Sequence, residues 1–342
     1  MSEYEAVIYK GFKQLSPKDW DCFVDQSPQG SLFCKSWWLQ AVCPIELEIL
    51  VLYKKDRIVA GLPMVRKKKF GFKKICTPCL THTLGVLLES PTSHKYTVKL
   101  SKEMKILKEF VKAIPTFDYF FMNFNYNFNN WLPFFWAGYS QTTYYSYVIS
   151  DLWDTKKIWE NFSSTVRKEI RKTEKDGLKV NESDDIEECL RLHKLAYGRQ
   201  SLVSPHPESS VRKLDEACRQ ENARKIFIAQ DSLKKNHAMY YVVYDSKSAH
   251  ALLAGADPAL RNSGAQYLVC WAAIQSLSSL SKQFDFSGGC ITTNIESHIR
   301  KFGGTLTPHY MITKNNMSSP KKALIGLYRT ARNTWNKIKS HS

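Results

Sequence analysis

One stretch decides the fold. Residues 249–304 read AHALLAGADPALRNSGAQYLVCWAAIQSLSSLSKQFDFSGGCITTNIESHIRKFGG. The apolar run over 249–256 predicts a buried strand, and Pro258 ends it. The polar turn at 261–264 opens a predicted helix over 265–280, because apolar residues recur there with a period near 3.6.

The same stretch continues with a short strand over 284–286 and a second helix over 291–302. Gly303 and Gly304 follow this helix and are typical of a C-cap. A strand, a turn, a helix and a strand form a right-handed crossover, and we expect its ligand where the turn meets the helix N-terminus. The residues predicted to bind the ligand there are Arg261, Asn262, Ser263 and Gly264.

Length and composition indicate a folded protein with a substantial core. The chain has 342 residues, of which 43% are hydrophobic and 13% aromatic, enough for one large or two medium domains. No apolar run approaches the roughly 20 residues that span a bilayer. Residues 1–5 lack the basic and apolar regions of a signal peptide, so we expect a cytoplasmic protein, with the inner face of the membrane as a second location.

The formal net charge is +17, which favours contact with polyanions such as nucleic acid, anionic lipid or a nucleotide-bearing substrate. A basic but merely soluble surface is the alternative. The nine cysteines include one close pair, Cys76 and Cys79, without the second pair that a zinc ribbon needs. No histidine spacing is typical of a metal ligand set either, so the sequence predicts reduced thiols and no metal site.

The chain divides into two halves that repeat one order of predicted elements: helices, an antiparallel hairpin, a further strand, a helix and a strand. The last strands of both halves also have similar sequences, at 117–120 and 284–286. We therefore interpret the chain as an internal duplication. The predicted domains are residues 1–150 and 151–318, followed by a basic amphipathic helix over 319–342 that would pack on the protein, lie on anionic lipid or follow an RNA backbone.

Basic and aromatic residues elsewhere are candidates for substrate binding. A predicted helix over 155–175 carries Arg167 and Arg171 one turn apart, either to grip a phosphate or as a solvated face. Trp37 and Trp38 would form a wall of the acceptor groove, unless they belong to the core. Arg199 and Gln200, in the loop before a Pro-His-Pro sequence, are further candidates on the acceptor side.

Three segments together resemble GNAT-type acyltransferases in their double-domain, Fem-like form. They are Leu152-Trp153 with the helix that ends at Gly177, the strand and helix over 253–274, and the Phe-Asp-Phe-Ser-Gly-Gly segment followed by Ile-Arg-Lys-Phe-Gly-Gly. That family includes the peptidoglycan aminoacyltransferases and acyltransferases related to cellulose-synthesis accessory proteins. In the first half, Ser36-Trp37-Trp38-Leu39 and the segments at 58–63 and 78–81 are also similar to the family.

The resemblance implies an α/β (α+β) fold of two tandem GNAT-like domains, each with a mixed, mostly antiparallel sheet flanked by helices. It implies an acyl donor bound at residues 261–264. The family's acetyl-CoA fingerprint has a small residue where this chain has Gln266, and the chain lacks a coiled-coil insertion that some tRNA-dependent members have. The donor therefore stays open between acyl-CoA and aminoacyl-tRNA, with no tightly bound cofactor.

The expected reaction is attack of an amine or hydroxyl on an activated acyl ester or thioester, which needs positioning, a proton acceptor and an oxyanion donor. Asp285 and Lys301 are the predicted catalytic residues. Asp285 would orient or deprotonate the acceptor, or else cap the following turn. Lys301 and Arg300 would hold phosphates, or else form a solvated helix end.

The sequence thus predicts an acyl or aminoacyl transferase that acts on a cell-envelope precursor or glycan, with tRNA as a candidate partner and a peripheral membrane contact through the C-terminal helix. One alternative is a coenzyme A-dependent sugar N- or O-acetyltransferase. The alternative of another class is a non-catalytic protein that binds RNA or membrane and keeps a relic of the fold.

Overall fold

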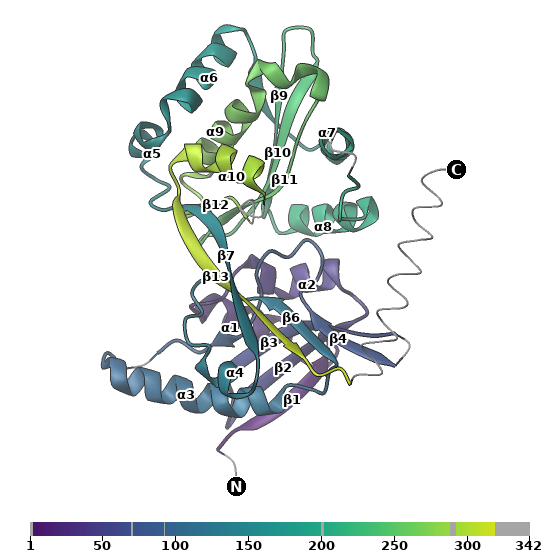
Figure 1. The fold of residues 1–342 in the computed structure, drawn as a ribbon, viewed down its shortest axis with the longest axis vertical. Helices are drawn as coiled ribbons and strands as arrows, with labels where there is room; N and C mark the ends of the chain where they lie inside the picture. The colour runs from purple at the N-terminus through teal and green to yellow at the C-terminus, as the bar shows by residue number, and fades with distance from the viewer. Residues whose placement is uncertain (1–2, 70, 92, 200–201, 288–291, 319–342) are drawn as a thin grey trace.

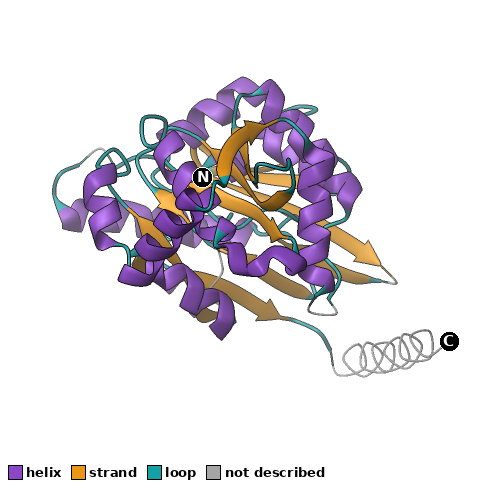
Figure 2. Ribbon diagram, turned by 90° about the horizontal axis from the view of Figure 1, so that it is seen from above, coloured by secondary structure: helices purple, strands orange, loops and turns teal. Residues whose placement is uncertain are grey.

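The computed structural model describes residues 3–318 except 70, 92, 200–201 and 288–291. Its strands form one mixed sheet with the order β1-β2-β3-β4-β6-β13-β7-β12-β11-β10-β9-β8, and β5 pairs with β3 (Figure 1). Helices cover both sides of this sheet (Figure 2). The predicted helix over 319–342 lies outside the described residues, as do Gln200 and the Gly288-Gly289 pair.

The first half runs from β1 to β7. Its elements are β1 (Glu5–Lys10), α1 (Pro17–Gln26), the 3-10 helix η1 (Leu32–Cys34), α2 (Ser36–Val42), β2 (Leu47–Lys54), β3 (Arg57–Lys69), β4 (Phe72–Cys76), β5 (Leu87–Leu88), α3 (Tyr96–Ala113), β6 (Tyr119–Asn123), α4 (Leu132–Trp136) and β7 (Ser140–Ile149).

The second half runs from α5 to β13. Its elements are α5 (Thr155–Asn161), α6 (Ser164–Lys175), β8 (Lys179–Ser183), α7 (Ile186–Gly198), α8 (Glu208–Gln220), β9 (Arg224–Gln230), β10 (Asn236–Tyr244), β11 (Ala249–Ala256), the 3-10 helix η2 (Pro258–Ser263), α9 (Ala265–Leu277), β12 (Phe284–Asp285), α10 (Thr293–Ile299), the 3-10 helix η4 (Arg300–Phe302) and β13 (Thr305–Asn315).

The two halves repeat the same order of elements, as the sequence predicts. After α5 and α6, the series β8, α7, α8, β9, β10, β11, α9, β12, α10, β13 follows the order of β1, α1, α2, β2, β3, β4, α3, β6, α4, β7. The directions of the strands repeat too, because β4–β6 and β11–β12 are parallel pairs while their neighbours are antiparallel. This repeated order supports the internal duplication.

Each half receives the last strand of the other. β13 lies between β6 and β7, and it pairs with β6 over residues 311–315. β7 in turn pairs with β12, so the strand that ends one half completes the sheet of the other. β7 and β13 also pair with each other over nine residue pairs, from Thr305 opposite Val148 to Thr313 opposite Ser140. The halves are therefore joined by main-chain hydrogen bonds and not only by a linker.

An apolar cluster also joins the halves, at a contact that we call the seam. Phe33 and Trp38 of the first half are fully buried in one cluster with Leu192 and Tyr241 of the second half. A lysine of the β10–β11 turn adds a polar contact, because Lys247 Nζ donates to main-chain carbonyls in the last part of α1 and in the loop after it.

Two expectations about elements need correction. The predicted single helix over 155–175 is two helices, because Ser163 interrupts it and its side chain accepts a hydrogen bond from the Val166 N–H, which caps α6. The strands β1, β8 and β13 were not predicted. Their exposed, mixed polar sequences carry a weak strand signal, as the burial pattern of β8 shows. The predicted crossover is confirmed, since β11, α9 and the parallel strand β12 follow in that order.

Candidate active site

The parallel strands β11 and β12 pair over a short distance and then separate. The two strands pair only through Ala249 opposite Phe284 and His250 opposite Asp285. Beyond these pairs β11 continues along β10, with a register shift that leaves Leu252 as a bulged residue. A bulge frees main-chain groups from the ladder, so main-chain polar atoms of β11 are available to a ligand at this position.

The N-terminus of α9 follows β11 through η2, beyond the end of β11 that does not pair with β12. Gly264 is the N-cap residue, with φ of 73°, and no side chain caps the helix. A Cβ atom at this position would lie 2.3 Å from Thr173 Oγ1 of α6, so glycine is required here by conformation and by space. The N-terminus of a helix carries a partial positive charge, which attracts a phosphate or another anion, as expected of a donor site.

The predicted donor residues lie together at this turn. Arg261, Asn262 and Ser263 form the last part of η2 directly before Gly264. The side chains of Arg261 and Asn262 are exposed, while Ser263 Oγ accepts from the Ala265 N–H at 3.4 Å and Ser263 O accepts from Thr173 Oγ1 at 2.8 Å. Ser263 thus shapes the turn, and Arg261 and Asn262 are free to contact a ligand.

Asp285 is a buried carboxylate of β12, opposite His250 of β11. Its side chain is 1% exposed and accepts hydrogen bonds from Ser146 Oγ of β7 and from the Ser287 N–H at 2.8 Å. Burial opposes the charged form, but the hydrogen bond and the attraction to the neighbouring His250 prevail and hold the pKa of Asp285 below its usual value. Asp285 is therefore an ionised carboxylate at neutral pH.

His250 pairs with this carboxylate, and the sequence analysis did not select it. Its Nδ1 lies 3.5 Å from Asp285 Oδ2 and 3.4 Å from Ser287 Oγ, and its ring contacts Phe33 at the seam. Its Nε2 is buried and has no hydrogen-bond partner within the described residues. The one available signal was a histidine inside an apolar strand.

This arrangement differs from a serine nucleophile with its base. Ser287 and Asp285 both face the same ring nitrogen of His250, whereas a Ser–His–Asp relay uses opposite nitrogens. An imidazole oriented by an ionised carboxylate is instead suited to accept a proton from an attacking amine or hydroxyl. We call His250, Asp285, Ser146 and Ser287 the reaction centre.

Two more histidines, which we call the seam histidines, lie close to the reaction centre. The rings of His82 and His309 are 5.5 Å apart, and His309 stacks on Tyr144 of β7. Burial lowers the pKa of both, and for His309 burial together with repulsion from His82 lowers it to about 4. His82 Nε2 and His309 Nδ1 are buried without a hydrogen-bond partner in the described part of the chain. Both rings are therefore neutral at pH 7.

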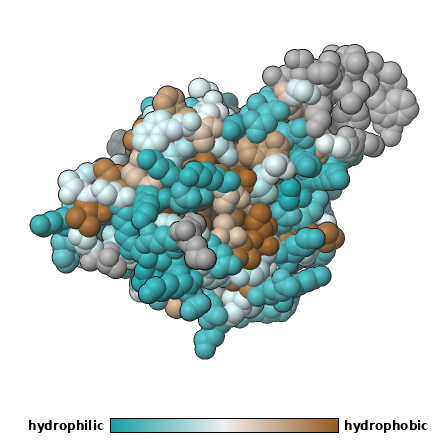
Figure 3. Space-filling view, turned by 90° about the horizontal axis from the view of Figure 1, so that it is seen from below, coloured by the Kyte–Doolittle hydropathy of each residue, from teal (hydrophilic) through white to brown (hydrophobic). Residues whose placement is uncertain are grey.

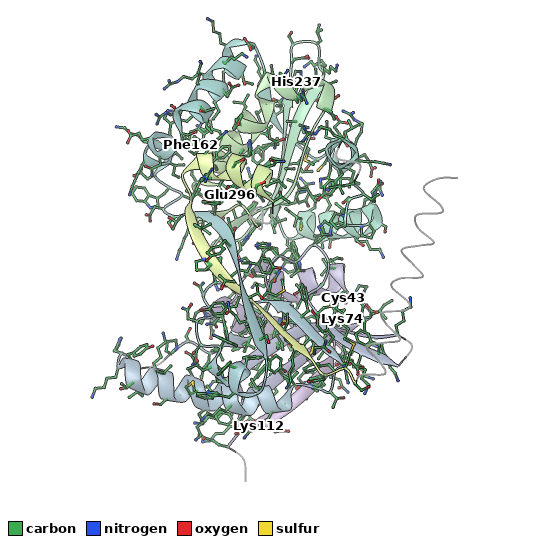
Figure 4. All side chains as sticks on the ribbon, in the orientation of Figure 1. Cys43, Lys74, Lys112, Phe162, His237 and Glu296 are labelled. Atoms are coloured by element: carbon green, nitrogen blue, oxygen red, sulfur yellow. The ribbon has the colours of Figure 1, made fainter. Side chains whose placement is uncertain are left out.

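Lys301 and Arg300 lie on η4, at the end of α10. The Lys301 carbonyl accepts from the Ser163 N–H at 2.8 Å, which holds η4 against the start of α6. Arg300 Nε lies 3.6 Å from Glu296, whose carboxylate also accepts from Tyr147 Oη at 2.7 Å. Figure 4 labels Glu296 next to the ends of β7 and β13 that face the second half.

The remaining basic candidates contact α5 or the end of α7. Arg167 Nη1 donates to the Glu160 carbonyl at 2.6 Å, and the Arg171 guanidinium lies 5.6 Å from the centroid of the Trp159 ring. Arg199 is the C-cap residue of α7, directly before the loop that leads to α8. Gln200 lies outside the described residues.

The two predicted tryptophans lie at the seam. Trp38 is fully buried, and its Nε1 donates to Thr81 Oγ1 at 3.0 Å. Trp37 is half-buried, and its ring contacts that of Trp38 at 5.7 Å in an edge-on arrangement. α2, which carries both, packs on α8 of the second half. The structure thus separates these tryptophans from the α9 turn and places them near Phe33 and His250.

The described residues contain neither a metal-binding group nor a membrane-spanning helix. No group of three or more His, Cys, Asp or Glu residues could hold a metal ion there. No helix in the same part of the chain is long and apolar enough to cross a membrane.

Comparisons with known proteins agree with this geometry. Residues 160–290 match the family described as Acetyltransferase (GNAT) domain. No curated protein has a significantly matching sequence. Among solved structures, FemX is similar with a TM-score of 0.68 and 10% identity, over 94% of this chain and 99% of FemX.

Two other structures show the same fold over most of the chain. A tandem GNAT protein from the clavulanic acid biosynthesis pathway has a TM-score of 0.54 and 10% identity, over 92% of this chain and 99% of that protein. The C-terminal domain of a putative lysylphosphatidylglycerol synthetase from Agrobacterium fabrum has a TM-score of 0.54 and 11% identity, over 92% and 95%. Residues 160–290 thus match the GNAT acetyltransferase domain family, and the chain as a whole shares its fold with FemX and with a tandem GNAT protein.

Proposed function

We propose that this protein transfers an acyl or aminoacyl group from a donor between β11 and β12 onto an amine or hydroxyl of a cell-envelope precursor or glycan. One observation carries the proposal: the parallel strands β11 and β12 separate after the buried His250–Asp285 pair, and β11 then leads to the N-terminus of α9. The structures that share this fold include FemX and a putative lysylphosphatidylglycerol synthetase domain, and this likeness supports acyl transfer of this general kind.

In the proposed arrangement, the phosphates of the donor contact the N–H groups of the first turn of α9, with Arg261 beside them. The acyl carbonyl lies near the bulge at Leu252, where a free main-chain group can donate to the oxyanion. The donor is acyl-CoA or aminoacyl-tRNA, which both present phosphates and an activated acyl group.

In the proposed reaction, the nitrogen or oxygen of the acceptor attacks the acyl carbon, and His250 Nε2 accepts the proton that the acceptor loses. Asp285 stabilises the imidazolium that forms. The tetrahedral intermediate then collapses, and the carbon–sulfur or carbon–oxygen bond to the donor breaks. His250 returns the proton to the leaving sulfur or oxygen, so no further reactant is needed.

We further propose two domains, residues 1–150 and 151–318, with the acceptor entering beside the seam, and a cytoplasmic location at the inner face of the membrane. Trp37 and Arg199 are the proposed contacts for the acceptor, while Lys301 and Arg300 hold its phosphates or those of the donor.

Donor binding is tested first, through the thermal stability of the full chain with and without acetyl-CoA. A ligand at 100 times its dissociation constant adds about 2.7 kcal/mol to the free energy of unfolding, which is readily measured. The variant Gln266→Glu places a carboxylate in the first turn of α9, where it stabilises the helix but repels a phosphate. We expect the acetyl-CoA shift in the native chain and its loss in this variant.

The outcome decides between the two donors. A shift that Gln266→Glu abolishes supports an acyl-CoA donor and directs the acceptor search to sugars. Without a shift, the same pair of proteins is compared for binding of aminoacyl-tRNA. Failure of both donors to bind the native chain would contradict the proposed function.

A further inference from the structure

The first half contains a large cavity at the place that corresponds to the proposed donor site. Its volume is about 500 Å³, and it lies between the N-terminal part of α3 and residues 127–132. In the repeated order of elements α3 corresponds to α9, and β6 corresponds to β12. The chain after β6 also separates from its parallel neighbour here, because the bridge between Leu84 and Phe124 is followed by β5, which pairs with β3 instead.

A buried glutamine, Gln29, lines this cavity. Gln29 Oε1 accepts from the Leu88 N–H at 3.1 Å, and Gln29 Nε2 donates to the Asn127 carbonyl at 3.3 Å. Gln29 is 7% exposed, so its amide bridges the two separating segments from a buried position. An amide exchanges hydrogen bonds but does not take up a proton at neutral pH, so Gln29 is suited to binding a ligand and not to proton transfer.

The walls of the cavity combine aromatic rings with primary amides. The aromatic residues that line it are Tyr96, Trp131 and Tyr310. Tyr96 is the first residue of α3, and its side chain is 71% exposed. Asn127 and Asn129 lie on the opposite wall with exposed side chains. Amphipathic aromatic rings bind the C–H faces of sugars, while amides exchange hydrogen bonds with hydroxyl groups.

The charges of the cavity cancel. Its charged lining residues are Glu89, Lys99, Lys102 and Glu103, and Lys102 is already paired with Glu89 at 2.7 Å. The whole chain, by contrast, has a formal net charge of +17. A phosphorylated ligand would need an excess of cations, so the balance favours an uncharged ligand.

We infer that this first-half cavity binds a neutral oligosaccharide. The inference deepens the proposed function, because it assigns a place for part of a glycan acceptor. Tyr310 lines the cavity, and its neighbour on β13 is the seam histidine His309, whose side chain points to the other face of the sheet. The cavity therefore lies on the face of β13 opposite to His309. Figure 3 shows this end of the molecule from below, with apolar side chains between hydrophilic ones.

The test measures binding alone, by isothermal titration of the full chain with chitotetraose and, separately, with cellotetraose. We expect the native chain to bind one of them and Tyr96→Ala to weaken that binding at least tenfold. Because Tyr96 is mostly exposed, its removal leaves the fold intact. Asn129→Ala provides a second variant in the opposite wall. The matched control is Trp136→Ala, since Trp136 is an exposed aromatic residue of α4 outside the cavity lining.

Each outcome decides the inference. Binding that Tyr96→Ala and Asn129→Ala weaken and Trp136→Ala leaves unchanged supports it. Binding of neither tetrasaccharide, or binding that all three variants leave unchanged, overturns it. Tighter binding of UDP than of the sugars, lost in Tyr96→Ala, overturns the neutral class of ligand. Donor binding is measured independently through Gln266→Glu, so a failure here is distinguishable from a failure of the proposed function.

Discussion

The two halves of this protein share an order of elements but differ in the strand that follows the crossover helix. β12 carries Asp285, which is 1% exposed and hydrogen-bonded to a side chain from β7. The corresponding β6 carries Phe120 and Met122 on its buried face, and its neighbourhood is closed by the Gln29 amide. The comparison teaches that the fold alone does not create the reaction centre. Among the described residues, only the second half has a buried ionisable pair at this place, and we propose that this pair transfers the proton.

The largest expected effect comes from exchanging the carboxylate of the reaction centre. Asp285→Asn keeps the shape but removes the charge that orients His250, so we expect the rate of acyl transfer to fall about 10²- to 10⁴-fold. The measurement is the rate with saturating donor, together with the thermal stability of the variant.

Asp118 of the first half is the matched control. It lies directly before β6, is 8% exposed and accepts from the Lys73 N–H at 2.8 Å. Asp118→Asn should lower stability and leave the transfer rate unchanged. Equal losses of rate in Asp285→Asn and Asp118→Asn would contradict the proposal that the two halves differ in function.

The second prediction concerns the pH dependence of stability, and it compares a histidine at the seam with a histidine in the second half. His309 at the seam and His298 on α10 both have a pKa lowered to about 4, mainly by burial, from an ordinary value of 6.5. The unfolded chain therefore binds more protons than the folded chain between pH 6.5 and 4. Stability from each histidine is complete above pH 6.5 and is lost as the pH falls to about 4, by about 3 kcal/mol each.

The measurement is urea unfolding from pH 7 to pH 4.5 for the native chain, His309→Gln and His298→Gln. Each variant should lose part of the pH dependence. If both histidines affect one common transition, the shared sheet makes the halves unfold together. Two transitions that respond separately, one to His309 and the other to His298, would show that the halves unfold independently.

A third and smaller effect compares two glycines with positive φ. Gly264 at the α9 turn and Gly71 in the β3–β4 turn have φ of 73° and 74°. An added Cβ atom meets Thr173 Oγ1 at 2.3 Å from Gly264 but nothing within 4 Å from Gly71. Gly71→Ala should cost about 1 kcal/mol for backbone strain, and Gly264→Ala about 2 kcal/mol because a clash is added.

Chemical unfolding of both variants measures the difference. Combining Gly264→Ala with Thr173→Ala removes the clashing hydroxyl and should recover part of the loss. A Gly264→Ala protein as stable as Gly71→Ala would mean that α6 moves away from the α9 turn at little cost.

The sequence was sufficient for the crossover that leads to the proposed donor site. The apolar run of β11, the polar turn ending at Gly264 and the amphipathic pattern of α9 are local signals, and all three elements appear in the structure. Asp285 was selected for the same reason, since it ends the strand after that helix. The duplication was also visible as a repeated order of elements.

Other features depend on contacts between distant segments and had no local signal. β13 is an extended, partly exposed strand whose partners, β6 and β7, precede it by more than 150 residues. His250 and the seam histidines belong to three separate segments and meet only because β13 crosses into the first half. Gln29 likewise acquires its role from Leu88 and Asn127, which no periodicity in the sequence connects to it.

The smallest expected effect concerns the polar contact at the seam. Lys247 Nζ donates to the carbonyls of Val24, Ser27 and Gly30 at 3.3, 3.1 and 3.2 Å, and burial lowers its pKa. Lys247→Met keeps the apolar stem but leaves these carbonyls without their donor, so the free energy of unfolding should fall by about 1–2 kcal/mol. Lys213→Met, at an exposed position of α8, should change it by less than about 0.5 kcal/mol.

The same pair of variants separates two ways in which the halves hold together. If β7 and β13 carry the connection, Lys247→Met lowers stability in one transition and the halves stay coupled, because the main-chain hydrogen bonds between these strands remain. If the seam carries it, Lys247→Met loosens the α1–α2 region against the second half, and limited proteolysis cuts there before global unfolding. We expect the first result, since β7 and β13 form nine residue pairs and their ladder lies between β6 of the first half and β12 of the second half. Early cleavage near residues 27–30 would show instead that the seam, and not the exchanged strands, positions His250 against the first half.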